Sequence, residues 1–374
     1  RSARTDQQRY AAALLAAQQR IDRLVSAERA YRLDCFPDLA TTLRVAEEPG
    51  RRLWERHPDP RGSPDFLHLR LGLGRVPSTV AVVAPPAADP APEPAQPVLD
   101  GFPVTVDLVG AGVVGVAAPP DRLQGLARSL LGQVAAWHSP REVRVAVLAP
   151  DGDLRWARWL PHRWGPGAGD DLLAALAAEL DARVERRERL RASELREPRI
   201  VLLLVDPGRV RTDPDLARLL TDGPSVGIVA LCLAGSTLDL PSQCRAVAEV
   251  VGETGTALRL TDHTGATFTG VIIDAADEAW VRRLARALAP LRDATTDPAE
   301  LPDDVRLLDL LGADVSGAAS AEALAESVSA RWIARPRGTT VPLGMAAGRE
   351  PLQVDLVADG PHLLVAGTTG AGKS

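Results

Sequence analysis

The chain has 374 residues, a formal net charge of −6 and an apolar content of 45%, which suits two or three globular domains with buried cores. The acidic balance contains no long block of like charge, so no overall field attracts nucleic acid or an anionic membrane. Three cysteines without a C-x-x-C pair predict neither a disulfide framework nor a zinc site.

Residues 1–48 are predicted to form a helical stalk. Seven residues recur at alternating spacings of four and three, which indicates one face of a helix that ends no later than Pro37. They are Tyr10, Leu14, Ala17, Ile21, Leu24, Glu28 and Tyr31. Two interpretations stay open. The helix is either a lever or coiled-coil arm that leads away from a membrane anchor, or an ordinary packed helix.

Residues 49–99 are predicted to form a small region that contains a strand and a proline-rich loop. Phe66–Leu71 alternates apolar and polar residues, which is typical of a half-buried strand. Six prolines lie between Pro85 and Pro97, and such a segment favours an extended loop or linker.

Residues 100–292 alternate apolar strands with helices. Strands are predicted at Val104–Leu108, Val113–Ala117, Val143–Leu148, Ile200–Val205, Gly227–Leu233 and Ala257–Leu260, and helices at Arg122–Ala136, Asp170–Leu195 and Glu278–Leu288. This alternation predicts an α/β domain with a mainly parallel sheet and helices on both faces. The arginines from Arg183 to Arg191 are interleaved with glutamates, which favours a solvated helix face.

The last 82 residues contain a predicted linker, 293–337, with one helix near Ala321–Ile333. Residues 338–374 then read as the start of a second α/β domain. Its strands are expected at Val341–Gly344, Leu352–Val357 and His362–Ala366, and the third leads directly into a glycine-rich end.

That end, GTTGAGKS, matches the phosphate-loop pattern G-x-x-x-x-G-K-[ST]. Its lysine is the single lysine among 43 basic residues. In such a loop the glycines permit close backbone approach, the ammonium neutralises β/γ-phosphate charge and the hydroxyl ligates magnesium. We therefore predict ATP and Mg²⁺ as cofactors, Ser374 as the magnesium ligand, and a nucleotide site made of Gly367, Thr368, Thr369, Gly370, Ala371, Gly372, Lys373 and Ser374.

The first α/β domain has a degenerate version of this chemistry. The stretch Gly115–Gly125 stands where a phosphate loop would follow an early strand, but its two prolines lack amide donors and it has no G-K-[ST] ending. Val201–Asp206 resembles a Walker B strand, yet Pro207 replaces the glutamate that would orient water. Asp206 is then a cap or turn residue. We predict no ATP hydrolysis and no catalytic residues in this chain, and leave open whether the degenerate domain binds nucleotide.

Several strings resemble one family. HLLVAGTTGAGKS is similar to the phosphate loop of FtsK/SpoIIIE motor ATPases. RLWER, DFLHLRLGLG, ARSLLGQVAAWHSP, WLPH, VLLLVDP and LPSQC resemble, in the same order, the region before the first motor domain of EccC, the membrane ATPase of actinobacterial type VII secretion.

The resemblance implies a stalk, a degenerate RecA-like domain of P-loop NTPase type, and the start of an FtsK/SpoIIIE domain up to its Walker A loop. It implies membrane helices upstream of Arg1, a place on the cytoplasmic face of the plasma membrane, and tandem motor domains downstream of Ser374. The implied partners are further copies in a hexamer, other membrane subunits of the secretion complex, and exported WXG-type helical proteins.

Three functions remain open at this point: a protein-export motor whose present part serves assembly or regulation, an FtsK/SpoIIIE-type DNA translocase, and a structural scaffold. The phosphate loop does not separate the first two. The acidic charge and the scarcity of Phe and Tyr favour export, because DNA-binding paths are basic and single-stranded nucleic acid stacks on aromatic rings.

Overall fold

The computed structural model describes residues 2–58, 65–82, 96–149, 154–165, 170–189, 197–205, 207–252, 254–293, 305–307, 310, 320–334, 338–345, 351–360 and 362–364. The chain forms two compact units, Arg1–Asp293 and Ala294–Ser374. The finer division expected from the sequence, with boundaries after residues 48, 99, 292 and 337, stays a prediction.

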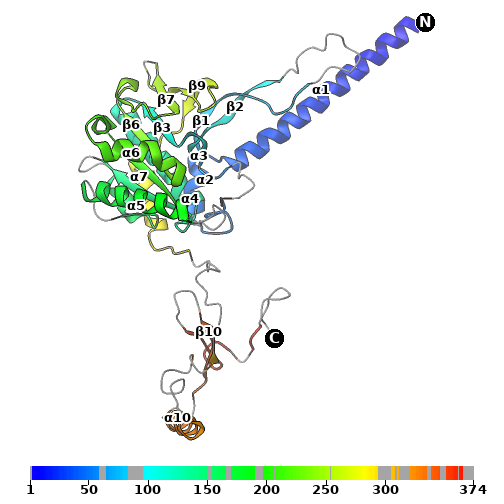
Figure 1. The fold of residues 1–374 in the computed structure, drawn as a ribbon. Helices are drawn as coiled ribbons and strands as arrows, with labels where there is room; N and C mark the ends of the chain where they lie inside the picture. Colours follow the sequence, from blue (N-terminus) through cyan, green and yellow to red (C-terminus); the bar gives the residue numbers. More distant parts are fainter. Residues whose placement is uncertain are drawn as a thin grey trace. The chain divides into compact units, whose positions relative to one another are not determined.

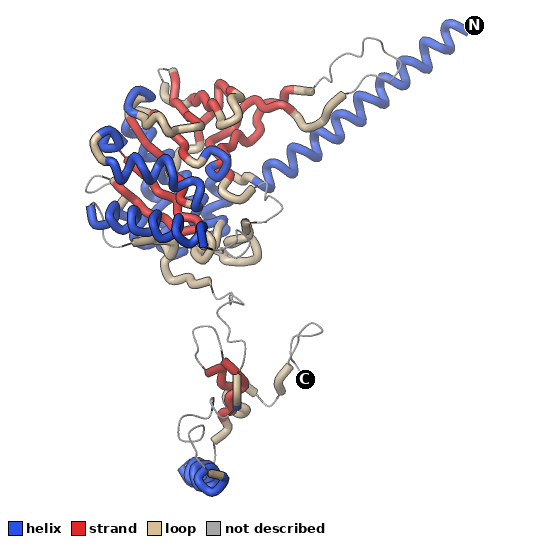
Figure 2. The backbone as a smooth tube through the Cα atoms, viewed as in Figure 1, coloured by secondary structure: helices blue, strands red, loops and turns tan. Residues whose placement is uncertain are grey.

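The first unit is built on a nine-stranded sheet with the order β2-β1-β9-β8-β7-β3-β6-β5-β4 (Figures 1 and 2). The five strands from β7 to β4 are parallel to one another, and the four from β2 to β8 extend the sheet in antiparallel fashion. The strands are β1 (His68–Pro77), β2 (Val98–Asp107), β3 (Val113–Ala117), β4 (Val143–Leu148), β5 (Arg199–Val205), β6 (Ile228–Ala234), β7 (Ala246–Val251), β8 (Ala257–Thr261) and β9 (Thr267–Ile273).

The parallel half confirms the predicted α/β class. Numbered along the chain from β3, its strands lie in the order 5-1-4-3-2, that of a RecA-like fold. β3 lies between β6 and β7, so the strand order reverses beside it, and in open α/β sheets ligands bind at the carboxyl ends of strands at such a switch point. The carboxyl end of β3 is therefore the place where a ligand would be expected in this domain.

Helices cover both faces of the sheet. On one face, α4 (Pro120–Trp137) packs on the sheet, and α2 (Leu39–Glu47) and α7 (Glu278–Leu288) pack on α4. On the other face lie α5 (Asp170–Arg189) and α6 (Pro214–Asp222). The short elements are α3 (Leu108–Ala111), η1 (Arg155–Trp159), η2 (Pro207–Arg211), η3 (Gly223–Val226) and η4 (Thr237–Asp239).

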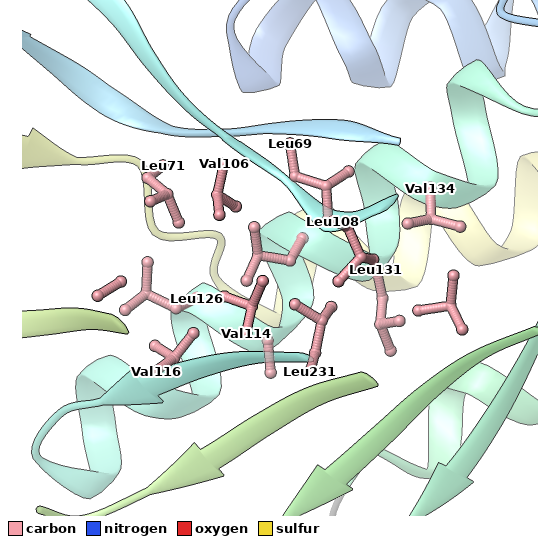
Figure 3. Packing of buried hydrophobic residues seen from close by; sticks show 14 of the residues in the cluster. Leu69, Leu71, Val106, Leu108, Val114, Val116, Leu126, Leu131, Val134 and Leu231 are labelled. Atoms are coloured by element: carbon pink, nitrogen blue, oxygen red, sulfur yellow. The ribbon is translucent and has the colours of Figure 1, made fainter. Parts of the chain in front are cut away.

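Successive side chains of the buried strands point to opposite faces of the sheet, and each face has its own hydrophobic core. In β6, Val229 and Leu231 face the core that contains α4, whereas Ile228 and Cys232 face the core of α5 and α6. Figure 3 shows the first core, with Leu126 and Leu131 of α4 among side chains of β1, β2, β3 and β6. Each fully buried aliphatic side chain contributes about 1.5–3 kcal/mol of hydrophobic free energy, so this layer holds α4 against the sheet.

The predicted N-terminal helix is confirmed as α1 (Ser2–Cys35). Its last turns contact β2 and the segment after β1: the Glu28 carboxylate accepts from Thr79 N at 3.0 Å, and the guanidinium of Arg29 lies 5.5 Å from the Phe102 ring. Farther toward the N-terminus Tyr10 is 67% exposed and Leu14 is also exposed. α1 thus extends past the sheet (Figure 1), and its role stays a prediction.

The second unit contains α10 (Ala321–Ala334) and a hairpin of β10 (Thr340–Met345) and β11 (Pro351–Asp355). α10 corresponds to the predicted helix, and β10 and β11 correspond to the first two predicted strands. The third predicted strand, His362–Ala366, is wrong over residues 362–364, which lie in neither helix nor strand. An apolar run becomes a strand only where a neighbouring strand pairs with it, and the hairpin pairs only with itself among the described residues. Residues 365 and 366 lie outside the described residues.

Candidate functional site: the carboxyl edge of the sheet and a buried joint

The turn from β3 into α4 occupies the position of a phosphate loop. Only Ala118 and Pro119 separate the two elements, and the Ala118 amide donates to the Ala234 carbonyl at 3.1 Å. Pro119 is the N-cap without a side-chain capping bond, and Pro120 is the first helical residue. Because a phosphate is bound by a ring of free backbone N–H groups at a helix N-terminus, this short turn lacks both the length and the donors.

The charges and amides at the start of α4 also oppose an anion. The carboxylate of Asp121 lies in the first turn, where it complements the helix dipole and repels phosphate. The amides of Arg122 and Leu123 already donate to the Pro119 carbonyl, at 3.0 and 2.8 Å. The backbone at this edge of the sheet therefore does not offer a phosphate-binding site.

The two glycines that bound this stretch serve packing. A Cβ on Gly115 would lie 2.7 Å from Leu240 Cδ1 and 3.1 Å from Cys244 Sγ, and a Cβ on Gly125 would lie 2.9 Å from the Cβ of Ala275. Both positions favour glycine because neighbouring side chains approach the backbone. The glycine pattern that suggested a degenerate phosphate loop has this physical origin.

The remaining predicted nucleotide residues lie outside the described residues. Asp206, predicted to be a cap or turn residue, also lies outside them, and the buried Pro207 that follows it begins η2. The predicted nucleotide residues are those of the whole terminal loop: Gly367, Thr368, Thr369, Gly370, Ala371, Gly372, Lys373 and Ser374. Their assignment to ATP and Mg²⁺ stays a prediction from the motif.

At the opposite end of α4 the structure forms a buried polar cluster, which we call the joint: Arg56, Arg70, Gln133, His138 and His162, with the rings of Phe36 and Trp137. Arg56 is its centre and is only 3% exposed. Its guanidinium lies 5.4 Å from the Phe36 ring and 5.0 Å from the Trp137 ring, and donates to the carbonyls of Cys35 and His68. Burial lowers the pKa of Arg56 to about 10, so it remains a cation at neutral pH and ties the end of α1 to the domain.

Two histidines of the joint are neutral. The Leu67 amide donates to His138 Nε2 at 2.9 Å, so Nδ1 carries the proton and donates to the Val134 carbonyl at 3.2 Å. His162 Nε2 donates to the His138 carbonyl at 2.7 Å, while its buried Nδ1 has no partner among the described residues. Burial lowers the pKa of His138 well below its ordinary value and that of His162 to about 4.

Gln133 and Arg70 complete the joint. The Gln133 amide accepts from Arg70 N at 2.8 Å and donates to Arg70 O at 2.9 Å, which fixes β1 against α4. The Arg70 side chain pairs with Asp274 at 2.6 Å and donates to the Phe36 carbonyl at 2.9 Å. The joint therefore connects the α1–α2 corner, β1, α4 and the segment before α7.

Comparisons with known proteins give a consistent result. The chain is 29% identical over 86% of its length to the ESX secretion system protein EccC of Thermomonospora curvata, and 29% identical over 93% to the ESX-3 secretion system protein EccC3 of Mycobacterium tuberculosis. It is 24% identical over 91% of its length to EccC of Geobacillus thermodenitrificans. It covers 26%, 27% and 24% of these relatives, so it spans about a quarter of their length.

The chain is similar to EccC proteins, which are of the FtsK/SpoIIIE type, over most of its length. No protein-family model matches it. Among solved structures, the cytoplasmic domain of the type VII secretion ATPase EccC from T. curvata aligns with 78% of this chain and 36% of its own, at 20% identity and a TM-score of 0.44. The curated relatives confirm the family resemblance expected from the sequence.

Four of the strings that carried the resemblance meet in the joint of this EccC-like chain. RLWER supplies Arg56, DFLHLRLGLG supplies Arg70, ARSLLGQVAAWHSP supplies Gln133 and His138, and WLPH supplies His162. They are distant in sequence and contact one another in the fold. Sequence reasoning missed this site, although a charged or imidazole side chain inside an apolar string was a usable signal.

The described part of the EccC-like chain shows two further absences. No helix there combines the length and apolar character needed to cross a membrane. No group of three or more His, Cys, Asp or Glu side chains gathers there as a set of metal ligands.

Proposed function

We propose that this chain is the membrane-proximal assembly and regulatory part of an EccC-like motor that powers type VII protein secretion. The observation that carries the proposal is the match over most of the chain to proteins named as EccC of ESX secretion systems. The closed turn at Pro119 and Pro120 supports a first α/β domain that takes no part in hydrolysis.

In this proposal ATP binds at the terminal loop. The amides of Gly367–Ser374 enclose the phosphates, Lys373 neutralises their charge and Ser374 ligates Mg²⁺. The Walker B carboxylates and any arginine finger needed for hydrolysis come from the motor domain that this loop opens, so residues 1–374 alone have no turnover.

The partners and the location in this proposal are those that the family resemblance implies. We expect a homo-oligomer, a hexamer in the intact motor, on the cytoplasmic face of the plasma membrane beside other membrane subunits of the secretion complex. Exported WXG-type helical proteins are the expected cargo. The joint supports the assembly role because Arg56 fastens α1 to the α/β domain through buried contacts.

Nucleotide titration tests the proposal. The 374-residue chain should show no saturable, magnesium-dependent binding of fluorescent ATP at the β3–α4 edge, and its extension by a complete motor domain should create such binding. Lys373→Ala in the extended chain should then abolish it. Unchanged affinity in that variant, or tight magnesium-dependent binding that survives it in the 374-residue chain, would contradict the proposal.

A DNA translocase is not favoured, because the matching relatives are named as secretion proteins and the chain has a net charge of −6. Duplex DNA at about 150 mM salt should give no electrophoretic shift with the chain, since non-specific binding needs many phosphate contacts from basic residues. A shift at that salt concentration would revive this alternative.

A further inference from the structure

A basic cleft lies in the first unit, away from the β3–α4 edge. It has a volume of about 750 Å³ and lies between η1, the segment that follows it, the start of β4 and the end of α7. The peptide after η1 is fixed along β4, because the Val145 amide donates to the His162 carbonyl at 2.8 Å and the Trp164 amide to the Val145 carbonyl at 2.9 Å. The cleft therefore has a rigid floor adjoining the joint.

Positive charge dominates the lining. Four arginines, Arg141, Arg144, Arg158 and Arg292, face a single acid, Asp293. The Asp293 carboxylate accepts from the Ser139 hydroxyl, and its carbonyl accepts from Arg141 Nε at 3.3 Å. One acid cannot balance four guanidinium groups, so the cleft has an excess of about three positive charges.

Three of these arginines are not neutralised by the described residues. Arg144 donates to the Pro161 carbonyl at 3.4 Å, Arg292 donates to the carbonyls of Ala289 and Leu291, and Arg158 lies 5.3 Å over the Trp159 ring. None of the three forms an ion pair with a carboxylate of the described residues. Partial burial and the nearby charge of Arg141 lower the pKa of Arg144, which marks a local surplus of cations.

An aromatic face accompanies the charge. Trp159 belongs to the cleft lining and is 58% exposed, although large aromatic side chains are usually buried. Guanidinium groups bind phosphate oxygens through paired N–H donors, and an indole ring stacks on a nucleobase. The two features together fit a ligand with phosphates at one end and a flat ring at the other.

We propose that this cleft binds an oligophosphate anion, such as the triphosphate of a nucleotide without magnesium. A single phosphate carries about 1.5 to 2 negative charges at pH 7, whereas a free triphosphate carries three or four and matches the surplus of the cleft. The volume lies within the range of about 300–1,000 Å³ typical of small-molecule sites. Magnesium removes two of the ligand's charges, so binding here weakens when magnesium is added, opposite to binding at a phosphate loop.

Calorimetric titration of the 374-residue chain tests the proposal. The chain carries Lys373→Ala, so that the terminal loop does not contribute, and is titrated with sodium tripolyphosphate or ATP in EDTA. Saturable binding is expected. Reversing two exposed charges with Arg158→Glu and Arg292→Glu should weaken it at least about tenfold, because each lost guanidinium removes a charge-assisted contact.

A matched pair of charge reversals outside the cleft, Arg211→Glu and Arg245→Glu, should change the affinity less than about twofold at physiological salt, where distant charges are screened. Equal weakening by both pairs, or no saturable binding, would overturn the proposal. If ATP binds more tightly than tripolyphosphate and Trp159→Ala removes only that difference, the indole stacks on the base. If the two ligands bind equally, the phosphates alone are recognised.

Vesicles distinguish a soluble ligand from a lipid. The same chain is mixed with phosphatidylcholine vesicles that contain phosphatidylglycerol. Co-sedimentation that requires Arg158 and Arg292, without binding of soluble oligophosphate, would overturn the proposed ligand and assign the cleft to membrane phosphates. Binding of tripolyphosphate that anionic vesicles do not displace would support the soluble anion.

Discussion

Replacing His162 with glutamine should flatten the pH dependence of folding stability. The buried imidazole donates to the His138 carbonyl through Nε2, and its Nδ1 has no partner among the described residues. A proton added at Nδ1 would therefore be a buried, unpaired charge. A glutamine amide can donate to the same carbonyl without titrating, so His162→Gln isolates the cost of protonation.

The magnitude follows from the two pKa values. His162 has a pKa of about 4 in the folded protein and an ordinary value of 6.5. Because the unfolded chain binds the proton more tightly, this contribution is fully present above pH 6.5 and declines as the pH falls toward 4. Linkage gives a loss of about 2 kcal/mol for this residue between about pH 7.5 and pH 5. The pKa of His138 is also lowered in the folded protein, so this residue likewise reduces folding stability as the pH falls.

Urea unfolding followed by circular dichroism at about pH 7.5, 6 and 5 measures the effect. Burial raises the pKa values of Glu142 and Asp274. These two carboxyl groups therefore stabilise the folded protein more as the pH falls, which opposes the effect of the histidines. They are present in both proteins, so the difference between wild type and His162→Gln reports on His162 alone. The exposed His362 offers a matched control, and His362→Gln should leave the slope unchanged. Parallel loss of stability in wild type and His162→Gln would refute the reasoning.

Three further substitutions test the packing that surrounds the joint. Asp274→Ala should cost about 3 kcal/mol in urea unfolding, because it leaves the 4% exposed Arg70 as an uncompensated buried charge; a cost below about 1 kcal/mol would contradict this. Gly72→Ala should lower the melting temperature by several degrees, since its Cβ would lie 1.9 Å from the Ile272 carbonyl oxygen; an unchanged melt would argue against the β1–β9 contact. Arg56→Met should speed hydrogen exchange at the end of α1 and cost about 2 kcal/mol, because it orphans two carbonyls; unchanged exchange would show that α1 is fixed without Arg56.

Four of the five parallel strands could be predicted because they are short continuous apolar runs. β3, β4 and α7 match the predicted bounds, and β5 and β6 differ by one residue at their ends, whereas β7 was not predicted. In the antiparallel half β8 differs from the predicted Ala257–Leu260 by one residue, but β9 was not predicted. β9 exposes four of its seven residues, and it pairs with β1, which lies about two hundred residues earlier, so its register depends on tertiary contacts.

The arginines of α5 show that a local sequence pattern also fails to predict the burial and the partners of charged residues. Interleaved glutamates favoured a solvated face, yet Arg183 is buried and pairs with Glu179 at 2.7 Å. It also donates to the carbonyls of Val226 and Pro198, which come from other elements. A helical pattern reports which residues share a face, whereas the partner across that face is set by the fold.

The two candidate sites differ in how far the sequence could define them. The phosphate loop is one continuous motif, so Gly367–Ser374 could be assigned from spacing alone. The joint draws on separate segments, and most of its contacts join residues far apart in the sequence. The family strings marked its residues, but only the fold shows that Arg56 and His138 belong to one buried cluster.

Helix α4 links these observations. At its first turn the bond from Ala118 to Ala234 and the two prolines close the edge where nucleotide would enter. At its last turn Trp137 and His138 receive the contacts that fasten α1 and β1. A helix fixed at both ends and buried along most of one face has few alternative arrangements, and coupling between sites needs an element with two discrete arrangements. By this criterion α4 holds the closed edge and the joint in place and is not an element that switches between two arrangements.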